Sequence, residues 1–358
     1  MTAPTDPLRS REFRRALRGW FRLRKRDLPW RRTLDPYAIW ISEVMLQQTQ
    51  VATVLSYYEP WMRHFPDVET LAAAGLDDVL MHWQGMGYYG RARTLHRAAG
   101  IIVRQHGGKL PCTCDRLGEI PGFGPYTAGA VASIAFGEAV PAVDGNVARV
   151  ISRVLGLSGH SSDPILRRGI TEILKPVVPK KNPGEFNQAL MELGATVCRP
   201  QIAHCNECPV SVMCTSRERI LLPGVASKRD SRPVRTIPVL RWTAFLVPGG
   251  RGGFLYRQRP MKGLFSGLWE LPTLERHYEP KGGLFLGEIE HRLTHRTIRL
   301  HVYRLRYLPR ELAGTEYSAF RTPPAVSVLI RKALVLAEGT VRKVSRPSAD
   351  RVIPGTLR

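Results

Sequence analysis

The stretch LGEIPGFGPYTAGA, residues 117–130, decides the fold, because it interrupts a helical region with a short turn rich in proline and glycine. We expect one helix to end near Ile120 and a second to begin near Tyr126. Gly122 and Gly124 permit positive φ and leave backbone N–H groups uncovered at the start of the second helix, where they can hold a phosphate. A Pro-Gly-x-Gly junction also joins helices that have no such role, so the turn alone leaves both interpretations open.

The residues around this turn have the apolar spacing of helices. Residues from about 8 to 220 are expected to be helical almost throughout, since apolar side chains recur at intervals of three and four. One such face comprises Val51, Val54, Leu55, Tyr58, Met62 and Phe65.

Composition changes near Leu222. Residues 223–236 are polar, basic and flanked by proline, which predicts a linker. Residues 237–340 are expected to form a separate α/β domain, followed by a basic tail at 341–358. Its expected strands are Trp242–Val247, Phe254–Arg257 and Ile298–Leu308.

The charge is strongly basic: 53 Lys and Arg stand against 30 Asp and Glu, a formal net charge of +23 over 358 residues. Such an excess favours a polyanionic partner, because each neutralised phosphate releases counterions. Nucleic acid is the first expectation, with a ribosome or a membrane surface as alternatives. No apolar run reaches the roughly 18 residues that span a bilayer, and residues 1–10 lack the apolar core of a secretory signal. We therefore expect an intracellular protein with no membrane partner, cytoplasmic and nucleoid-associated if bacterial.

Four of the six cysteines lie close together in the order Cys-x6-Cys-x2-Cys-x5-Cys. They are Cys198, Cys205, Cys208 and Cys214. In a reducing compartment such a group indicates a metal before disulfides. Zinc and a [4Fe–4S] cluster both accept four thiolates, although a zinc site more often has two close Cys-x2-Cys pairs. His204 could substitute as a ligand, and Cys112 and Cys114 are expected to be free.

The cysteine spacing resembles the iron–sulfur loop of the endonuclease III superfamily of DNA glycosylases. Upstream, Asp144 in VDGNV is a suitable N-cap for a helix running to Leu155, a common role for aspartate. With the turn at 117–130, Asp144 also resembles the helix-hairpin-helix and Gly/Pro-Asp signature of that superfamily, over about residues 30–220. The resemblance implies an all-α glycosylase core with a [4Fe–4S] loop. Its implied parts within residues 1–222 are a six-helix lobe at about 31–140 and a second lobe from 1–30 and 141–222.

In this superfamily DNA is bent into the cleft between the lobes and one base is flipped into a pocket. The resemblance places Asp144 beside the deoxyribose C1′, where it would stabilise an oxocarbenium-like state by charge or by transient covalent attachment. Tyr126 and Asn146 would hydrogen-bond around Asp144. Bifunctional members carry at position 126 a lysine that forms a Schiff base, so Tyr126 predicts a monofunctional enzyme.

The segment PYAIWISEVMLQQTQV, residues 36–51, resembles that of adenine glycosylases of the MutY type. Adenine leaves poorly as an anion, so its N7 must be protonated by a general acid. Glu43, lodged among apolar neighbours such as Ile39 and Trp40, could have a raised pKa while Asp144 stays ionised. For an isolated glutamate a solvated helix position would be the simpler interpretation, but the motif favours the catalytic one.

The same resemblance assigns contacts with DNA to further residues. Gln48 and Thr49 should approach the mispair. Tyr88, in the glycine-flanked segment GMGYYG at 85–90, should wedge into the base stack, with a core position as the alternative. The adenine pocket would be lined by Trp30, Arg31 and Gln188.

The segment GLFSGLWELP, residues 263–272, resembles the start of a Nudix fold, whose hydrolases hold magnesium with a glutamate-rich helix. Residues 273–283 lack the Arg-Glu-x-x-Glu-Glu run, so this Nudix-like domain is expected to recognise 8-oxoguanine rather than hydrolyse nucleotides. The recognition loop of the family centres on Phe-Ser-His. Thr294 and His295 keep the hydroxyl and the imidazole, whereas Leu293 departs from the aromatic residue.

The resemblance therefore implies a monofunctional adenine DNA glycosylase of base excision repair, acting as a monomer. Its expected partner is double-stranded DNA with adenine opposite 8-oxoguanine or guanine. The alternatives are a thymine or uracil mismatch glycosylase, which can also lack the lysine, and a non-catalytic DNA-damage binding protein. Glu43 and the C-terminal domain argue against the mismatch enzyme, and the missing glutamates argue against a Nudix pyrophosphatase.

Overall fold

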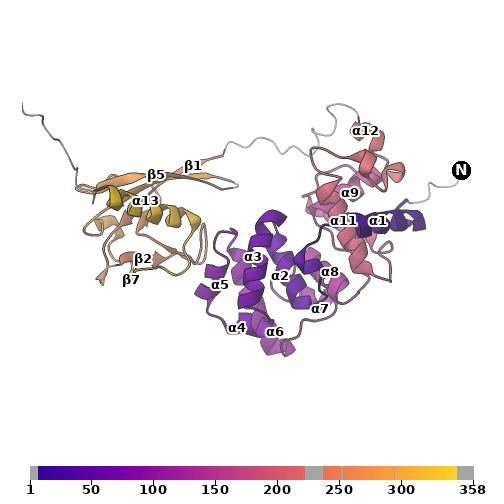
Figure 1. Ribbon diagram of the computed structural model, residues 1–358, viewed down its shortest axis with the longest axis horizontal. Coiled ribbons are helices and arrows are strands. Elements are labelled where there is room, and N and C mark those ends of the chain that lie inside the picture. The colour runs from indigo at the N-terminus through magenta and orange to yellow at the C-terminus, as the bar shows by residue number, and fades with distance from the viewer. Residues whose placement is uncertain (1–6, 222–236, 251–252, 294, 345–358) are drawn as a thin grey trace, which may run out of the picture. The chain divides into compact units, whose positions relative to one another are not determined.

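The computed structural model describes residues 7–221, 237–250, 253–293 and 295–344 (Figure 1). These residues divide into two compact units. The first unit comprises the described residues up to Leu221, apart from Trp83–Tyr89. The second comprises Trp83–Tyr89 and the described residues from Ile237 onward.

The first unit consists of helices joined by short turns. Its α-helices are α1 (Arg11–Arg24), α2 (Pro36–Leu46), α3 (Val51–His64), α4 (Val68–Ala73), α5 (Leu76–His82), α6 (Gly90–His106), α7 (Cys114–Gly118), α8 (Pro125–Ala135), α9 (Gly145–Leu155), α10 (Pro164–Leu174), α11 (Pro183–Thr196) and α12 (Arg217–Leu221). Its 3-10 helices are η1 (Pro7–Arg9), η2 (Pro29–Arg31), η3 (Cys205–Glu207) and η4 (Ser211–Met213). No strand is assigned among the described residues of this unit, so the predicted helical region is confirmed.

One apolar core brings the first helix of this unit together with its last long helices. Leu17 and Phe21 of α1 pack in the same cluster as Val150 of α9, Leu174 of α10 and Leu190 of α11. These side chains are buried, and their removal from water stabilises the lobe. The chain therefore returns to its first helix after passing through α2–α8. Within this core, α9 and α11 lie side by side (Figure 1).

Helix α2 is buried along most of its length and carries two buried polar side chains. Pro36 occupies its first turn, and the Asp35 side chain caps it by accepting hydrogen bonds from the backbone N–H groups of Tyr37 and Ala38. The helix packs between α3 and α8, so every residue from Tyr37 to Met45 is buried. Glu43 is therefore held in an apolar environment by the helix that carries it.

The second unit contains two sheets and a long helix. Its strands are β1 (Val239–Leu246), β2 (Phe254–Gln258), β3 (Trp269–Glu270), β4 (Thr273–Leu274), β5 (Leu284–Arg292), β6 (Thr297–Arg304) and β7 (Ser318–Phe320). One sheet has the order β4-β1-β6-β5, with β1 parallel to β6 and the other pairs antiparallel; the second has the order β3-β2-β7 and is antiparallel. Between β6 and β7 lies η6 (Arg310–Leu312), and α13 (Val328–Val344) packs against β5.

The three predicted strands correspond to β1, β2 and β6 with shifted ends, and β3, β4, β5 and β7 were not predicted. The third predicted run ends at Arg304 rather than Leu308, because its parallel partner β1 ends at Leu246 and offers no further ladder. Strand β5 was not predicted, since most of its residues are at least partly exposed and its sequence lacks apolar alternation. Helix α13 continues through Val344, into the stretch expected as a tail.

The linker expected at 223–236 and the tail from 345 onward lie outside the described residues. Within the described part of the chain, no helix is both long and apolar enough to cross a membrane.

Candidate active site and cysteine centre

The side chain of the buried Glu43 on α2 pairs with that of the half-buried Tyr126 on α8. The Tyr126 hydroxyl donates a hydrogen bond to Glu43 Oε2 and lies 3.8 Å from Met191 Sδ. Burial raises the pKa of Glu43 to about 7; the Tyr126 hydrogen bond lowers it, the Asp144 carboxylate raises it and the Arg31 charge lowers it. A carboxyl group with this pKa can hold a proton at neutral pH and also release it.

Asp144 is the N-cap of α9, as predicted. Its carboxylate accepts hydrogen bonds of 2.7 Å from the backbone N–H of Val147 and from Asn146 Nδ2. Burial raises the pKa of Asp144, whereas these hydrogen bonds and the charge of Arg149 lower it. The expected bond from Asn146 is thus confirmed, but the bond expected from Tyr126 is directed to Glu43 instead.

Arg149 connects this capping site to the cysteine loop, a connection that the sequence did not predict. Its guanidinium donates to Asn146 Oδ1 and to the carbonyl of Gly194, both at 2.8 Å, and to the carbonyl of Cys198 at 2.9 Å. Asn146 in turn donates to Asp144. One feature of the sequence could have indicated this connection: Arg149 lies among the apolar residues on the buried face of α9. A charge buried there must be satisfied by hydrogen-bond acceptors within the protein.

Beside this network, the backbone of α11 at Gly194 lies in close contact with α9 at Asn146. A Cβ atom added to Gly194 would lie 2.6 Å from the Cβ of Asn146 and 2.9 Å from its carbonyl oxygen. Glycine is therefore the residue that allows α11 to reach Asn146. Any larger side chain would displace the amide that holds Asp144.

The predicted turn lies between α7 and α8. Gly122 has φ +94°, and a Cβ there would lie 2.6 Å from Thr94 Cγ2, so glycine is required. Gly124 does not use the freedom to adopt positive φ, since it caps α8 with φ −70°, a conformation open to most residues. A Cβ at Gly124 would meet nothing within 4 Å, so the backbone at the start of α8 is uncovered.

Gln48 and Thr49 lie in the turn that follows α2. Gln48 is exposed and has φ +57°, a left-handed conformation that is uncommon for a residue other than glycine. Arg91, which was not predicted from the sequence, holds this turn: its guanidinium donates to Thr49 Oγ1 at 2.9 Å. The same group also donates to the backbone carbonyls of Val44, Met45 and Gln47.

Tyr88 has φ +49° and an exposed fraction of 42%, so the alternative of a core position is wrong. Its loop is internally bonded: Trp83 Nε1 donates to the Gly87 carbonyl at 2.9 Å, and Gly85 N donates to the Tyr89 hydroxyl at 3.1 Å. A bulky residue in left-handed backbone conformation is strained, and such strain is concentrated at functional positions.

Trp30, Arg31 and Gln188 line one open cavity of the first unit. Trp30 is buried with its ring edge against Tyr58, at 5.2 Å between centroids. Arg31 is fixed by Glu192, since its Nη2 donates to Glu192 Oε2 at 2.8 Å. The structure therefore brings these three predicted residues together.

Glu192 was not predicted, and its environment differs from that of Glu43. Arg26 donates to both carboxylate oxygens at 2.8 and 2.7 Å, in addition to the bond from Arg31. Burial by itself would raise the pKa of Glu192, but the hydrogen bonds and charges of the two arginines outweigh it and hold the pKa at about 2. This carboxylate stays ionised at neutral pH.

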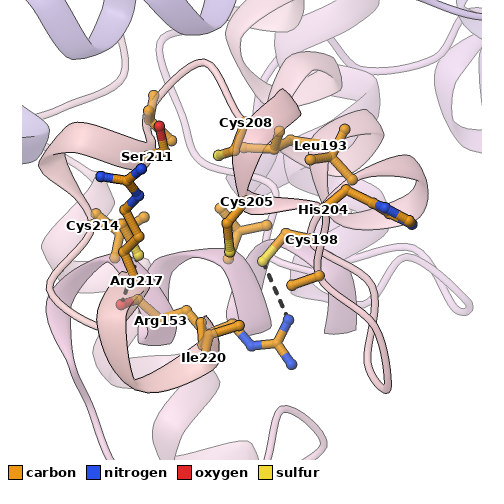
Figure 2. Close-up of a pocket in the computed structure, with 15 residues that line it drawn as sticks. Arg153, Leu193, Cys198, His204, Cys205, Cys208, Ser211, Cys214, Arg217 and Ile220 are labelled. Atoms are coloured by element: carbon orange, nitrogen blue, oxygen red, sulfur yellow. Dashed lines mark hydrogen bonds between the residues drawn. The ribbon is translucent and has the colours of Figure 1, made fainter. Parts of the chain in front are cut away.

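The four clustered cysteines line a single pocket, with Arg153 beside them (Figure 2). None of the six cysteines forms a disulfide. Arg153 donates to Cys198 Sγ at 3.3 Å and to the carbonyls of Arg199 and Pro200. Burial and the charges of the other three cysteines together raise the pKa of Cys208 to about 12, although a backbone hydrogen bond at Val210 lowers it. Four thiolates in one pocket would repel each other, so they suit a bound cationic centre.

In the second unit, His295 is exposed and Leu293 packs against the sheet core, while Thr294 lies outside the described residues. The glutamates near the Nudix-like segment are engaged by arginines. Glu270 accepts from Arg257 at 2.8 Å and from Arg259 at 2.6 Å, and Glu275 also pairs with Arg259. These carboxylates are therefore committed to ion pairs within the chain.

Comparison with known proteins identifies the family. Residues 41–176 match the HhH-GPD superfamily of base excision DNA repair proteins. The adenine DNA glycosylase of Rattus norvegicus is 39% identical, over 78% of this chain and 64% of its own length. That of Mus musculus is 37% identical, over 87% of this chain and 72% of its own length. That of Homo sapiens is 37% identical, over 82% of this chain and 66% of its own length.

The chain thus spans slightly less than two thirds of the rat and human proteins. Among solved structures, a thermostable thymine-DNA glycosylase is similar with a TM-score of 0.54 and 28% identity, over 58% of this chain and 95% of that chain. The helical unit is therefore an HhH-GPD glycosylase core, and by its similarity over most of its length the chain belongs to the adenine DNA glycosylase family.

Proposed function

We propose that the protein is a monofunctional adenine DNA glycosylase that hydrolyses the N-glycosidic bond of adenine mispaired with 8-oxoguanine or guanine. The observation that carries the proposal is the hydrogen bond from Tyr126 to the buried Glu43, whose pKa is also raised by the charge of Asp144. With a pKa of about 7, Glu43 can hold a proton for adenine N7 and deliver it as the glycosidic bond breaks. The names of the curated relatives support adenine as the base.

Asp144 is proposed to act on the sugar. As an ionised carboxylate at the N-terminus of α9, it would stabilise positive charge that develops at C1′. Asn146 and Val147 hold its two oxygens in place, and Arg149 holds Asn146. These bonds stabilise the charged form against the effect of burial.

Tyr126 is proposed to orient Glu43 rather than to form a covalent bond with the sugar. Burial raises the pKa of Tyr126 well above its usual value, so the phenol remains a neutral donor to the glutamate. A phenol cannot form the Schiff base that strand cleavage requires. The enzyme would therefore leave an abasic site that is cut only by added alkali.

The bound DNA is proposed to contact the uncovered N-terminus of α8 at Gly122 and Gly124, together with Gln48 and Thr49 near the mispair and Tyr88 as the wedge. The hairpin N–H groups would hold a backbone phosphate. The exposed side chains and left-handed backbone of Gln48 and Tyr88 support direct contact with bases. Trp30, Arg31 and Gln188 would line the adenine pocket.

Cys198, Cys205, Cys208 and Cys214 are proposed to hold a [4Fe–4S] cluster. Thiolates around one zinc ion lie about 3.8 Å apart, as follows from a Zn–S distance of about 2.3 Å. Among the described residues, the four sulfurs do not form a group whose members all lie within 4.8 Å, which favours a larger cluster. Its role would be to hold the loop that contacts Arg149 and Arg153. Purified protein should contain about four irons per chain, and C208S should lose them whereas C112S keeps them.

The second unit is proposed to be the Nudix-like domain that recognises 8-oxoguanine, at residues 237–340, through Thr294 and His295. The ion pairs of Glu270 and Glu275 support a recognition role over magnesium-dependent hydrolysis. Its exposed His295 lies between β5 and β6 in the chain, where it is open to a base. The proposed glycosylase region is 1–222, with lobes at about 31–140 and at 1–30 with 141–222, acting as a monomer.

The decisive experiment measures adenine release from a duplex with one adenine opposite 8-oxoguanine, and thymine opposite guanine serves as the second substrate. We expect alkali-dependent cleavage of the adenine strand, and D144N should lose it by at least about 10³-fold. The matched control is D163N, which alters another N-cap, that of α10, at an exposed position. Release of thymine alone would favour the mismatch enzyme, to which the similarity of the thymine-DNA glycosylase structure points. Tight binding with neither base released would indicate a damage-binding protein.

A further inference from the structure

Two histidines and an aspartate meet on the surface of the first unit. His64 is the last residue of α3, and Asp78 and His82 lie one turn apart on α5. His64 Nε2 lies 2.9 Å from Asp78 Oδ2, and His82 Nδ1 lies 3.2 Å from Asp78 Oδ1. The three side chains are partly exposed, so the group is open to ions from solvent.

The donor atoms of this group have the spacing of a metal site. One ligand atom from each residue lies within 4.8 Å of the other two. Around a tetrahedral ion with ligands at about 2.0–2.1 Å, the ligand atoms lie about 3.3 Å apart, so the spacing fits and the imidazole rings would have to turn to direct their nitrogens at one ion. An Asp and a His at positions i and i+4 lie on the same face of α5, and His64 approaches that face from α3.

The surrounding residues keep the two imidazoles close together. The rings of His64 and His82 are stacked, with centroids 3.7 Å apart and planes inclined by 19°. The buried ring of Phe65 packs edge-on against both, at 4.6 Å from His64 and 5.3 Å from His82. Tyr37 fixes Phe65 by donating to its carbonyl at 2.8 Å. Preorganised ligands lose less conformational entropy when an ion binds.

We propose that His64, Asp78 and His82 form a binding site for a divalent transition-metal ion of the zinc class. Two imidazole nitrogens and one carboxylate oxygen are ligands that zinc accepts, and three protein ligands leave a fourth position for water. The bound ion would join the end of α3 to the end of α5. His82 directly precedes the segment 83–89 that carries Tyr88, so the ion would fix the base of that loop.

The experiment measures zinc binding to the full-length protein at pH 7.5, with iron content determined in the same samples. Wild type, H64A, H82A and D78N are dialysed against ZnCl2, and bound zinc is counted per chain. The matched control is H106A, which removes a histidine of α6 outside the group. Circular dichroism checks that each variant is folded, and D78N preserves side-chain size. Because zinc held by cysteines would be the same in all five proteins, only the difference between them is used.

We expect wild type and H106A to bind one more zinc than the three variants, whose affinity should fall at least about tenfold. Zinc should also raise the unfolding temperature of wild type and H106A but not of the variants, because it binds the folded state. Equal zinc content in all five proteins, or no zinc-dependent rise in wild type, would overturn the proposal. Adenine release plays no part in the test, so its outcome is independent of the proposed activity.

Discussion

Glu43 and Glu192 are both buried glutamates on helices of the first unit, yet their environments have opposite effects. Glu43 accepts a hydrogen bond from the neutral phenol of Tyr126, and its pKa is raised to about 7. Glu192 accepts hydrogen bonds from Arg26 and Arg31, and its pKa is lowered to about 2. Burial is the largest single influence on both, and in both it raises the pKa. The partner therefore decides whether a buried carboxyl group can exchange a proton.

This difference in hydrogen-bond partner separates the catalytic role proposed for Glu43 from the structural role of Glu192. An ion-paired Glu192 ties the segment after α1 to α11 and positions Arg31 at the cavity. Glu43 accepts its hydrogen bond from a phenol instead of a guanidinium, and burial destabilises its charged form. Active sites often retain such unfavourable groups at the expense of stability. Four measurements test this comparison.

The largest expected effect is on activity. E43Q should reduce adenine release by about 10²–10⁴-fold, because the amide cannot donate the proton. It should also raise the free energy of unfolding at pH 7.5 by about 1–3 kcal/mol, since it removes a carboxyl group whose ionisation the fold opposes. Single-turnover kinetics and urea unfolding of the same sample measure both. If E43Q stayed active or were less stable than wild type, Glu43 would not be the proton donor proposed here.

The second effect is on stability. E192Q should lower the free energy of unfolding by about 3–5 kcal/mol, because it leaves two arginines at a buried site without their counter-charge. Adenine release per folded molecule should fall by less than about tenfold. The control E185Q removes a more exposed carboxylate that pairs with Arg18 and Arg22, and it should cost less than about 1 kcal/mol. Equal costs for the two variants would contradict a special role for Glu192.

The third measurement is pH dependence. Glu192 has a depressed pKa, so its stabilisation is complete above the unfolded value near 4.5 and is lost as pH falls toward 2. Glu43 has a raised pKa, so its contribution to stability declines as pH rises from 4.5 to about 7. Adenine release should also decline above pH 7, as Glu43 loses its proton. E43Q should abolish the stability decline between pH 4.5 and 7, and E192Q should remove the loss below 4.5.

The smallest expected effect is that of Y126F. The Tyr126 hydrogen bond lowers the pKa of Glu43, so its removal should shift the alkaline limb of the activity profile upward by at most about one pH unit. Activity at the optimum should stay within about tenfold of wild type. An unshifted profile would mean that the phenol does not tune the glutamate. Strand cleavage without alkali by wild type would contradict the monofunctional assignment.

Several features of the molecule follow from the sequence because they depend on near neighbours. The Asp144 cap forms with Val147 three residues away, and the turn at 117–130 carries its own proline and glycines. The helical region follows from its periodic apolar side chains, and the cysteine group from its spacing. Family resemblance added the proposed roles of Glu43 and the DNA-contacting residues, and these roles remain predictions.

The remaining features required the tertiary structure, because their partners are distant in the chain. Tyr126 meets Glu43 across 83 residues, and Arg26 meets Glu192 across 166. No local pattern predicts that one glutamate is paired with a phenol and the other with two arginines, nor that Arg91 and Arg149 hold the backbone and side chains beside the candidate site. Strand β5 escaped prediction because its polar sequence is stabilised by pairing with β6. Local sequence determines where the helices of the first unit form, while packing determines which charges meet, and those contacts set the pKa values on which the proposed chemistry depends.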